Sequence, residues 1–301
     1  MITTSLLLLG LLSASPSPAE PACPPAGTAR ASLAQLKAKE FEIADAIERN
    51  DLALKLTACL EDPDPEIRDR VAFEALSTWL RKKALTPPTI LALAHSLKTM
   101  LAGPADRAGF RLPFAALALS EVARADRIEP VFTDALRAEL VDLAASSFSR
   151  VEDYRGFDEK EGWRHGVAHG ADLLLQLGVN PKVGAEGLKK LMDAAQTQIS
   201  PQGAVFYTYG EPERIARAVN FTYRRGVLDA AYWDAWFTAL ADPRPFANWG
   251  ASYTTRAGLA RRHNRIALAH AIGFAGRAAG DDVGKALAAL ADRAATQIMG
   301  G

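Results

Sequence analysis

The chain lacks an excess of either charge. Its 301 residues include 35 lysines and arginines and 35 aspartates and glutamates, so its formal net charge is zero. Nucleic acid and anionic membrane surfaces select proteins with a basic excess. A long hydrophobic run is also missing, because Leu6–Leu12 is far shorter than the roughly 20 apolar residues of a membrane-spanning helix. We therefore predict no nucleic-acid partner and no membrane span.

Cysteine is scarce, since Cys23 and Cys59 are the only two in the sequence. Two cysteines alone do not make a zinc site. In an oxidising compartment the pair can form a disulfide, which contributes about 2–4 kcal/mol to stability. Two free thiols are the alternative, and the sequence leaves both open.

The N-terminus has the pattern of an export signal. The leucine run is interrupted by Gly10 and is followed by small residues and proline, and Ser17–Ala19 offers a small-x-small cleavage site. The first five residues contain no lysine or arginine, so an apolar tail on a cytoplasmic protein is the alternative. We predict a signal peptide at residues 1–19, and hence a periplasmic or secreted protein. A disordered Pro-, Ala- and Gly-rich leader is expected at 20–29, and a single domain at 30–301.

No stretch alternates with period two for long enough to form a sheet, and β-branched residues are comparatively few. Alanine is abundant, and apolar residues recur at helical spacing. We predict an all-α fold without a sheet. The expected architecture is a HEAT- or armadillo-like α-solenoid, or an irregular helical array, of about ten to twelve helices.

Two local features support this architecture. Asp62 is expected to cap a helix that starts at Pro63 or Pro65 and contains a buried isoleucine and arginine, as in HEAT-type repeats. A helix over 105–125 should be kinked at Pro113. Further helices are predicted at about 86–103, 128–148, 162–177, 182–198, 211–225, 228–241, 252–276 and 280–298.

The common catalytic motifs are absent. The sequence has no P-loop, no dinucleotide-binding glycine motif, no Gly-x-Ser-x-Gly elbow and no Cys–His nucleophile arrangement. Polar side chains are instead concentrated between Ser149 and Leu177, which makes this stretch the best site candidate. Its polar and aromatic members include Asp153, Tyr154, Arg155, Asp158, Glu159, Glu161, Trp163, His165, His169 and Asp172.

Within this stretch we expect a loop over 153–161 and then a helix. At about 100° per residue, His165, His169 and Asp172 form one polar stripe. These three residues can bind a divalent metal, although Gly166 stands where the metalloprotease signature has glutamate. They can also act as an acid/base pair, or form a structural clasp in which Arg155 pairs with Asp172 or Glu161. No cofactor is predicted beyond this possible metal.

A ridge of small residues lies beside the polar stripe. It consists of Gly162, Gly166 and Gly170. Each glycine inside a helix costs about 1 kcal/mol relative to alanine. We expect the close approach of another helix or of a ligand to offset this cost.

The same stretch resembles a bacterial family known as domain of unknown function 2785. The family carries an E-D-Y-R-G segment followed by a G-W-x-H-x-x-A-H-x-x-D-L-L helix, and Glu152–Gly156 and Gly162–Leu174 match it. A second segment, similar to the family's E-x-E-R-[IL]-A helix start, begins at Glu211, with Pro212 in place of an expected acid. The resemblance covers about residues 50–275. Because the family has no established activity, it implies a location for the site and no chemistry.

Two clusters outside this stretch are weaker candidates. The first is an aromatic cluster on a predicted helix, typical of a side-chain core, and consists of Tyr232, Trp233, Trp236 and Phe237. The second is a basic run at a helix start that can bind an anionic group or form a solvated helix face. It contains Arg256, Arg261, Arg262, His263 and Arg265, beside Trp249 and Tyr253.

We predict an exported helical-repeat scaffold that binds an unknown small molecule or protein. The alternative is a metal-dependent or acid/base hydrolase that uses His165, His169 and Asp172, so enzyme activity is left open. The predicted polar site consists of Asp153, Tyr154, Arg155, Glu161, Trp163, His165, His169, Asp172, Glu213 and Arg214.

Overall fold

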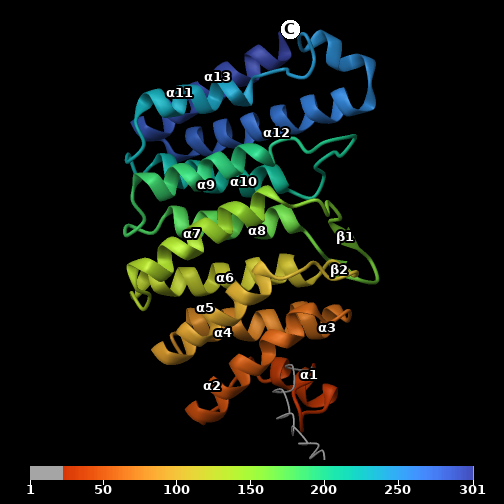
Figure 1. The fold of residues 1–301 in the computed structure, drawn as a ribbon, viewed down its shortest axis with the longest axis vertical. Helices are drawn as coiled ribbons and strands as arrows, with labels where there is room; N and C mark the ends of the chain where they lie inside the picture. Colours follow the sequence, from red (N-terminus) through yellow and green to blue (C-terminus); the bar gives the residue numbers. More distant parts are fainter. Residues whose placement is uncertain (1–22, 301) are drawn as a thin grey trace, which may run out of the picture.

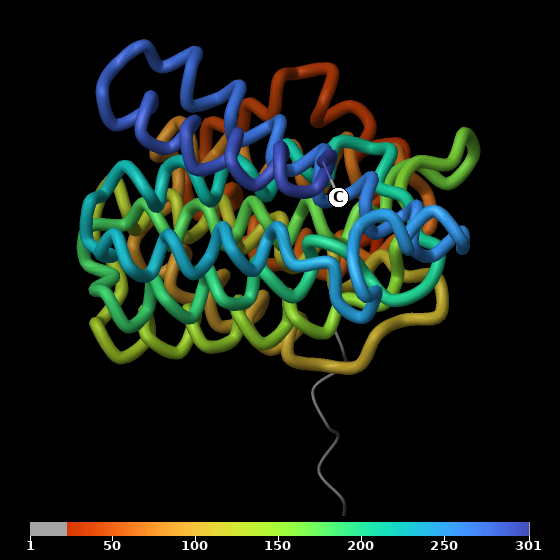
Figure 2. The backbone as a smooth tube through the Cα atoms, turned by 90° about the horizontal axis from the view of Figure 1, so that it is seen from above, coloured from red at the N-terminus to blue at the C-terminus, as the bar shows by residue number. Residues whose placement is uncertain are grey.

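The computed structural model of the chain describes residues 23–300 and confirms an all-α array (Figure 1). The predicted signal peptide lies outside these residues, as does the start of the leader. Seen along the long axis, the first and last helices are displaced to the same side, so the array is curved (Figure 2). In the described part, no helix is long and apolar enough to cross a membrane.

Most of the predicted helices are present with small shifts at their ends. The early ones are α1 (Arg30–Ala38), α2 (Ala46–Lys55), η1 (Leu56–Glu61), α3 (Pro65–Ile67), η2 (Arg68–Phe73), α4 (Glu74–Arg81) and α5 (Pro87–Ala102). They are followed by α6 (Arg111–Ile128), α7 (Asp134–Ser149), α8 (Gly166–Gly178), α9 (Ala185–Thr197), α10 (Glu211–Tyr223), α11 (Ala230–Leu240), η3 (Gly250–Thr254), α12 (Arg256–Ala279) and α13 (Asp282–Met299).

From α4 onward the helices stack in two columns. In one column α4, α6, α8, α10 and α12 each pack against the next, and in the other α7 packs against α5 and α9, and α11 against α9 and α13. The columns also pack against each other, as α5 does against α6 and α12 against α13. The buried apolar side chains form one continuous core between them.

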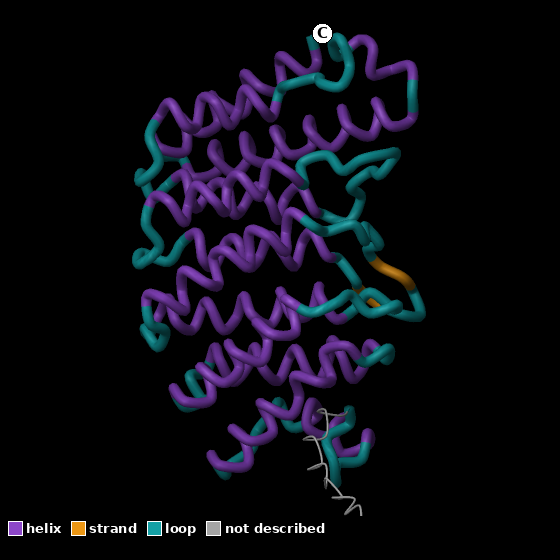
Figure 3. The backbone as a smooth tube through the Cα atoms, viewed as in Figure 1, coloured by secondary structure: helices purple, strands orange, loops and turns teal. Residues whose placement is uncertain are grey.

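The connections differ in length at the two edges of the array (Figure 3). Those at one edge, which we call the long-loop edge, are 103–110, 150–165, 198–210 and 241–255. Those at the opposite edge are 129–133, 179–184, 224–229 and 280–281. Long insertions at one edge of a helical-repeat protein commonly form its binding surface. The densest polar sequence lies in the longest of these connections.

Two helix starts differ from prediction. Asp64, rather than Asp62, caps α3 by accepting a hydrogen bond from the Glu66 N–H (3.0 Å). Helix α6 starts at Arg111, because the Asp106 carboxylate accepts the backbone N–H groups of Gly109 (2.9 Å) and Arg111 (2.9 Å) in the preceding turn. Pro113 is therefore in the first turn, where its N–H has no intrahelical acceptor to lose, and the predicted kink was wrong.

Arg68 is fully buried, as predicted, and connects the N-terminal helices to the longest loop. Its guanidinium donates to the carbonyls of Asp62 (3.0 Å) and Glu161 (2.6 Å) and lies 3.7 Å from the Phe110 ring centroid. A disulfide between Cys23 and Cys59 attaches the start of the described chain to η1.

The prediction of no sheet misses one short hairpin. Strand β1 (Phe157–Asp158) pairs antiparallel with β2 (Gly162–Trp163) within the loop before α8. The Asp158 carboxylate closes the turn by accepting the N–H groups of Lys160 (2.8 Å) and Glu161 (2.9 Å). Helix α8 consequently begins at Gly166, four residues later than expected.

The glycine ridge is explained by the packing of protein groups. A Cβ at Gly170 would lie 2.6 Å from Phe148 Cδ2 on α7, and one at Gly162 would lie 2.9 Å from the Arg68 guanidinium. Gly166 is less tight, with Val151 Cγ1 and the Asp153 carbonyl oxygen at 3.4 Å. The ridge thus lets α7 and the loop before α8 approach the helix closely.

Replacing Gly170 by alanine is expected to destabilise the protein. Helix propensity favours alanine by about 1 kcal/mol, but the new methyl group must displace the buried Phe148 ring, which costs about 1–3 kcal/mol. Urea denaturation should show a lower free energy of unfolding. The control is Gly184→Ala, where a Cβ meets nothing within 4 Å and stability should be nearly unchanged. Equal stabilities of the two variants would contradict this explanation of the ridge.

Candidate functional site

The DYRG loop (Asp153–Gly156) is held by an internal ion pair. Arg155 Nε donates to Asp153 Oδ1 (2.8 Å), and the Arg155 N–H donates to the same oxygen (3.1 Å). Arg155 Nη2 also donates to the carbonyl of Ala108 (3.2 Å). Arg155 was predicted to pair with Asp172 or Glu161. This prediction was wrong, because Arg155 pairs with Asp153, two residues away.

The connection before α6 is shaped to receive this ion pair. Gly109 has a left-handed conformation (φ +81°), and a Cβ there would collide with the Asp153 carboxylate. Arg164 Nε donates to the same Ala108 carbonyl (2.7 Å), and Arg164 Nη2 forms an ion pair with Glu161 (2.9 Å). Sequence reasoning missed Ala108 and Gly109, which carry no polar side chain.

Tyr154 takes no part in the ion pair and anchors the loop through other contacts. Its hydroxyl lies 2.8 Å from the Val151 carbonyl oxygen and 3.2 Å from Gln198 Oε1. Gln198 in turn donates to the Val151 carbonyl (3.1 Å), so the loops before α8 and α10 share one hydrogen-bond network. These contacts indicate a structural role for Tyr154.

A pocket of about 670 Å³ lies beside the DYRG loop, and we call it the DYRG pocket. The polar residues that line it are Asp106, Ser147, Arg150, Glu152, Asp153 and Arg155. The remaining wall is apolar or glycine: Leu101, Ala102, Gly103, Ala105, Gly109, Leu112, Pro113, Ala116, Phe148, Val151, Gly166 and Gly170. Of the ten predicted site residues, only Asp153 and Arg155 line it.

His165 lies immediately before α8, with a left-handed backbone (φ 57°). Its ring stacks on Trp163 (4.7 Å between centroids) and meets the His169 ring edge-on (5.6 Å). It is 7 % exposed, and no described residue accepts or donates at its Nε2. Burial and the neighbouring Arg214 lower the pKa of His165 to about 4, so this imidazole is neutral at physiological pH.

His169 is likewise a buried imidazole, with a ring nitrogen unpartnered within residues 23–300. Its ring packs edge-on against Phe114 (5.2 Å), and among the described residues its Nδ1 has no partner. Burial lowers the pKa of His169 well below its usual value, and the charges of His165 and Arg214 would lower it further. Both histidines are therefore neutral aromatic groups inside the protein.

Asp172 forms an ion pair with Arg214 on α10. Burial raises the pKa of the Asp172 carboxyl, whereas the charges of Arg214 and Arg217 lower it in part. This pair joins the predicted first and second segments, as the clasp interpretation expects for Asp172, although with a different arginine. Glu213 is exposed on the neighbouring turn, and its buried neighbour Glu211 accepts the N–H of Tyr209 (2.9 Å).

The three predicted metal ligands do not form a cluster of the required kind. The two imidazoles contact each other through an edge, and the Asp172 carboxylate binds Arg214. Throughout residues 23–300, no group of three or more His, Cys, Asp or Glu side chains is arranged to hold a metal ion. The polar stripe is an interface between α8 and its neighbours.

Trp163 belongs to a partly exposed aromatic cluster on the hairpin. Its ring lies 5.0 Å from Phe157 and 6.1 Å from Tyr209, whose exposed fractions are 46 % and 42 %. A Cβ at Gly156 would collide with the Tyr209 ring. The cluster therefore depends on a glycine within the DYRG loop.

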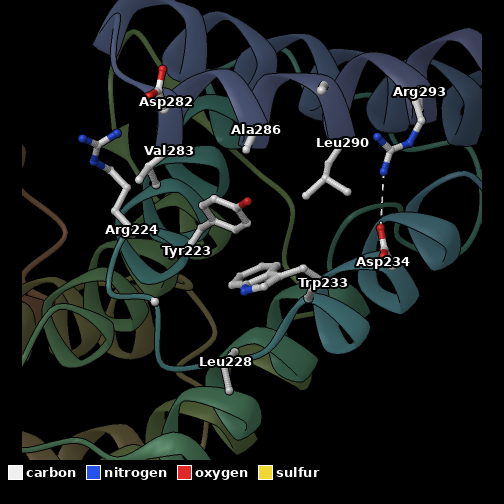
Figure 4. A pocket seen from close by; sticks show the side chains of 13 residues that line it. Tyr223, Arg224, Leu228, Trp233, Asp234, Asp282, Val283, Ala286, Leu290 and Arg293 are labelled. Atoms are coloured by element: carbon white, nitrogen blue, oxygen red, sulfur yellow. Dashed lines mark hydrogen bonds and ion pairs between the residues drawn. The ribbon is translucent and has the colours of Figure 1, made fainter.

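The C-terminal helices line a second, open pocket of about 670 Å³, between α10, α11 and α13 (Figure 4). Trp233 and Tyr223 point into it from one side and Leu290 from the other, and an ion pair between Arg293 and Asp234 (3.3 Å) spans one end. Trp233, Trp236 and Phe237 are buried, so the predicted aromatic cluster is part of the core.

Fold and site together define an all-α helical array with a loop-lined pocket at one edge. The family model described as "Protein of unknown function (DUF2785)" matches residues 97–274, and the chain belongs to this family. The match includes the DYRG loop, α8 and α10, which carry the predicted signature. No curated protein and no solved structure matches the chain.

Replacing His169 by alanine should reduce stability. The imidazole is 7 % exposed and packs against Phe114 and His165, so its removal leaves a cavity and should cost about 2–3 kcal/mol. Urea denaturation gives this value directly. His95→Ala, at an exposed position of α5, is the control and should lie within about 0.5 kcal/mol of the original protein. Unchanged stability of His169→Ala would argue against the packing role.

Stability should decrease as the pH falls from 6.5 to about 4. An unfolded histidine has a pKa near 6.5, whereas that of folded His165 is about 4. Between these values only the unfolded chain binds the proton, so the stabilisation is complete above pH 6.5 and is lost toward pH 4. The expected contribution is about 2–3 kcal/mol.

His165→Asn tests this assignment, because asparagine tolerates a left-handed backbone. Urea denaturation at several pH values between 4 and 7 should show a shallower decrease for this variant than for the original protein. His95→Asn should retain the full decrease. If the two variants had the same pH dependence, His165 would not be its source.

Proposed function

We propose that the protein is an exported HEAT-like binding scaffold whose ligand occupies the DYRG pocket. Two features support export: the predicted signal peptide at residues 1–19, and the Cys23–Cys59 disulfide, a bond that persists in oxidising compartments. The two-column stacking of α4–α13 supports the repeat-scaffold class.

The observation that carries the proposal is the pocket bounded by the Asp153–Arg155 pair. Its volume of about 670 Å³ lies in the roughly 300–1,000 Å³ range of small-molecule sites. Asp153 holds Arg155 in place through Nε and Nη2, and no acceptor for Arg155 Nη1 is found in residues 23–300. A preorganised guanidinium with a free N–H suits a carboxylate or carbonyl group.

The rest of the pocket favours a ligand that also has an apolar part. Leu112, Ala116 and Phe148 form an apolar wall, while Glu152 and Arg150 supply charges of both signs. A small molecule or a peptide segment with an acceptor group and an apolar side fits this surface. The ion pair at the rim then supplies orientation, and the apolar wall supplies affinity.

The hydrolase alternative is less well supported by the geometry. His165 and His169 are each 7 % exposed and do not line the DYRG pocket, and Asp172 is paired with Arg214. A general acid or base must reach within hydrogen-bond distance of the substrate. These residues are instead placed to join α8, α10 and the loop between α7 and α8.

A pocket-blocking substitution tests the proposal. Ala102 is exposed and lines the DYRG pocket, so Ala102→Trp should occlude it without disturbing the core. Saturation-transfer NMR with a mixed library of small carboxylates, dipeptides and sugars should give compounds that bind the original protein. Their signals should be lost with Ala102→Trp and also weakened with Arg155→Gln.

Ala135→Trp, at an exposed position of α7 outside the pocket, is the matched control and should retain the binding. Compounds that bind all three variants equally would place the ligand elsewhere. Turnover of a library compound that disappears with His169→Ala, in a variant that remains folded, would favour the hydrolase.

A further inference from the structure

One segment of this neutral chain contains basic residues and no acidic ones. Residues 243–280 contain six arginines, two histidines and neither aspartate nor glutamate. This segment comprises most of the loop before α12 and the whole of that helix. The basic residues are Arg244, Arg256, Arg261, Arg262, His263, Arg265, His270 and Arg277.

Some of these arginines have structural partners. Arg244 and Arg277 form ion pairs with Asp242 and Asp292. Arg265 Nη1 donates to the carbonyls of Ala239 and Leu240 at the end of α11 (both 2.6 Å). Arg261 Nη1 donates to Ser200 Oγ (3.0 Å). These four residues are already engaged in the fold.

Arg256 and Arg262 have aromatic neighbours instead. The Arg262 guanidinium lies 5.0 Å from the Tyr253 ring centroid, and that of Arg256 lies 5.5 Å from the Phe206 centroid. Within residues 23–300 neither forms an ion pair with a carboxylate, and Arg262 Nε is buried without a hydrogen-bond partner. A guanidinium group that stacks on an aromatic ring through its face can still donate hydrogen bonds from its planar edge.

A groove of about 580 Å³ runs along this face of α12. Its nitrogen-bearing side chains are Arg262, His263 and His270, and no carboxylate lines it; His263 Nε2 lies 3.3 Å from the Tyr207 carbonyl oxygen. Its apolar members are Phe206, Leu259, Ile266 and Ala267, and Leu259 is 39 % exposed. The α12 groove thus combines an apolar wall with one arginine and two histidines.

We propose that the α12 groove binds an amphiphilic anion, that is, a carboxylate or phosphate attached to an alkyl or aryl group. The oxyanion would pair with Arg262, beside His263 and His270, and the apolar part would cover Leu259 and Ile266. Charge complementarity selects an anion, because the groove contains donors and no carboxylate to compete for them. This site is separate from the DYRG pocket and does not depend on its ligand.

Dodecanoate is the probe, and isothermal titration calorimetry below its micellar concentration measures binding. Two comparison probes separate the contributions of head and tail. Inorganic phosphate provides an anion without a tail, and dodecyltrimethylammonium provides the same tail with a positive head. We expect dodecanoate to bind at least about tenfold more tightly than either, because each lacks one half of the recognition.

Variants locate the site. Arg262→Gln should weaken dodecanoate binding by about tenfold or more, since a charge-assisted hydrogen bond is lost. Arg277→Gln is the same substitution on the same helix outside the groove, and should bind as the original protein does. Leu259→Ser should weaken dodecanoate binding and leave phosphate binding unchanged. Circular dichroism melts confirm that each variant is folded.

Several outcomes would overturn the proposal. Phosphate that binds as tightly as dodecanoate would identify an adventitious anion site only. Equal affinities of Arg262→Gln and Arg277→Gln would place binding elsewhere. Sedimentation of the protein with phosphatidylglycerol vesicles, without binding of monomeric dodecanoate, would identify a membrane-surface contact in place of the groove. Binding of no probe would also reject it.

Discussion

Helix α8 is buried on nearly every side, and this burial constrains the surrounding structure. It packs against α6, α7, α9 and α10, and 11 of its 13 residues are buried. Polar side chains on such a helix must be neutral or paired. His165 and His169 are neutral, and Asp172 is paired with Arg214. Phe148 approaches so closely at Gly170 that the position has no room for a side chain.

The same burial decides where ligands can bind. The polar stripe is used to join helices, so it is closed to solvent, while the loop leading into α8 must pass over the ends of α6 and α7. That loop carries the Asp153–Arg155 pair to the start of α6, where the Ala108 carbonyl and Gly109 receive it. The pocket lies between the loop and those helix ends. The position of the proposed binding site at the long-loop edge is thus a consequence of how α8 is connected.

The two proposed sites differ in electrostatic character. In the DYRG pocket the rim carries acids and arginines together, and the key arginine is held by a carboxylate. The α12 groove contains Arg262 and two histidines but no acidic side chain. A neutral net charge therefore conceals a separation of charge along the array. The loop containing Phe206 and Tyr209 approaches both regions, since the Tyr209 ring lies against Gly156 of the DYRG loop and Phe206 lines the groove.

The sequence by itself determined the all-α class, most helix positions and the family, because these depend on local periodicity and contiguous motifs. It did not determine the partners of Arg155 and Asp172, or the split between a pocket and a buried stripe. Those depend on contacts between segments about 45 residues apart, such as Arg155 with Ala108 and Asp172 with Arg214. It also placed Pro113 in a helix interior, because helical periodicity did not reveal the local turn in which Asp106 accepts the N–H groups of Gly109 and Arg111. Neighbouring residues specify helices; long-range packing decided which polar groups remain open to a ligand.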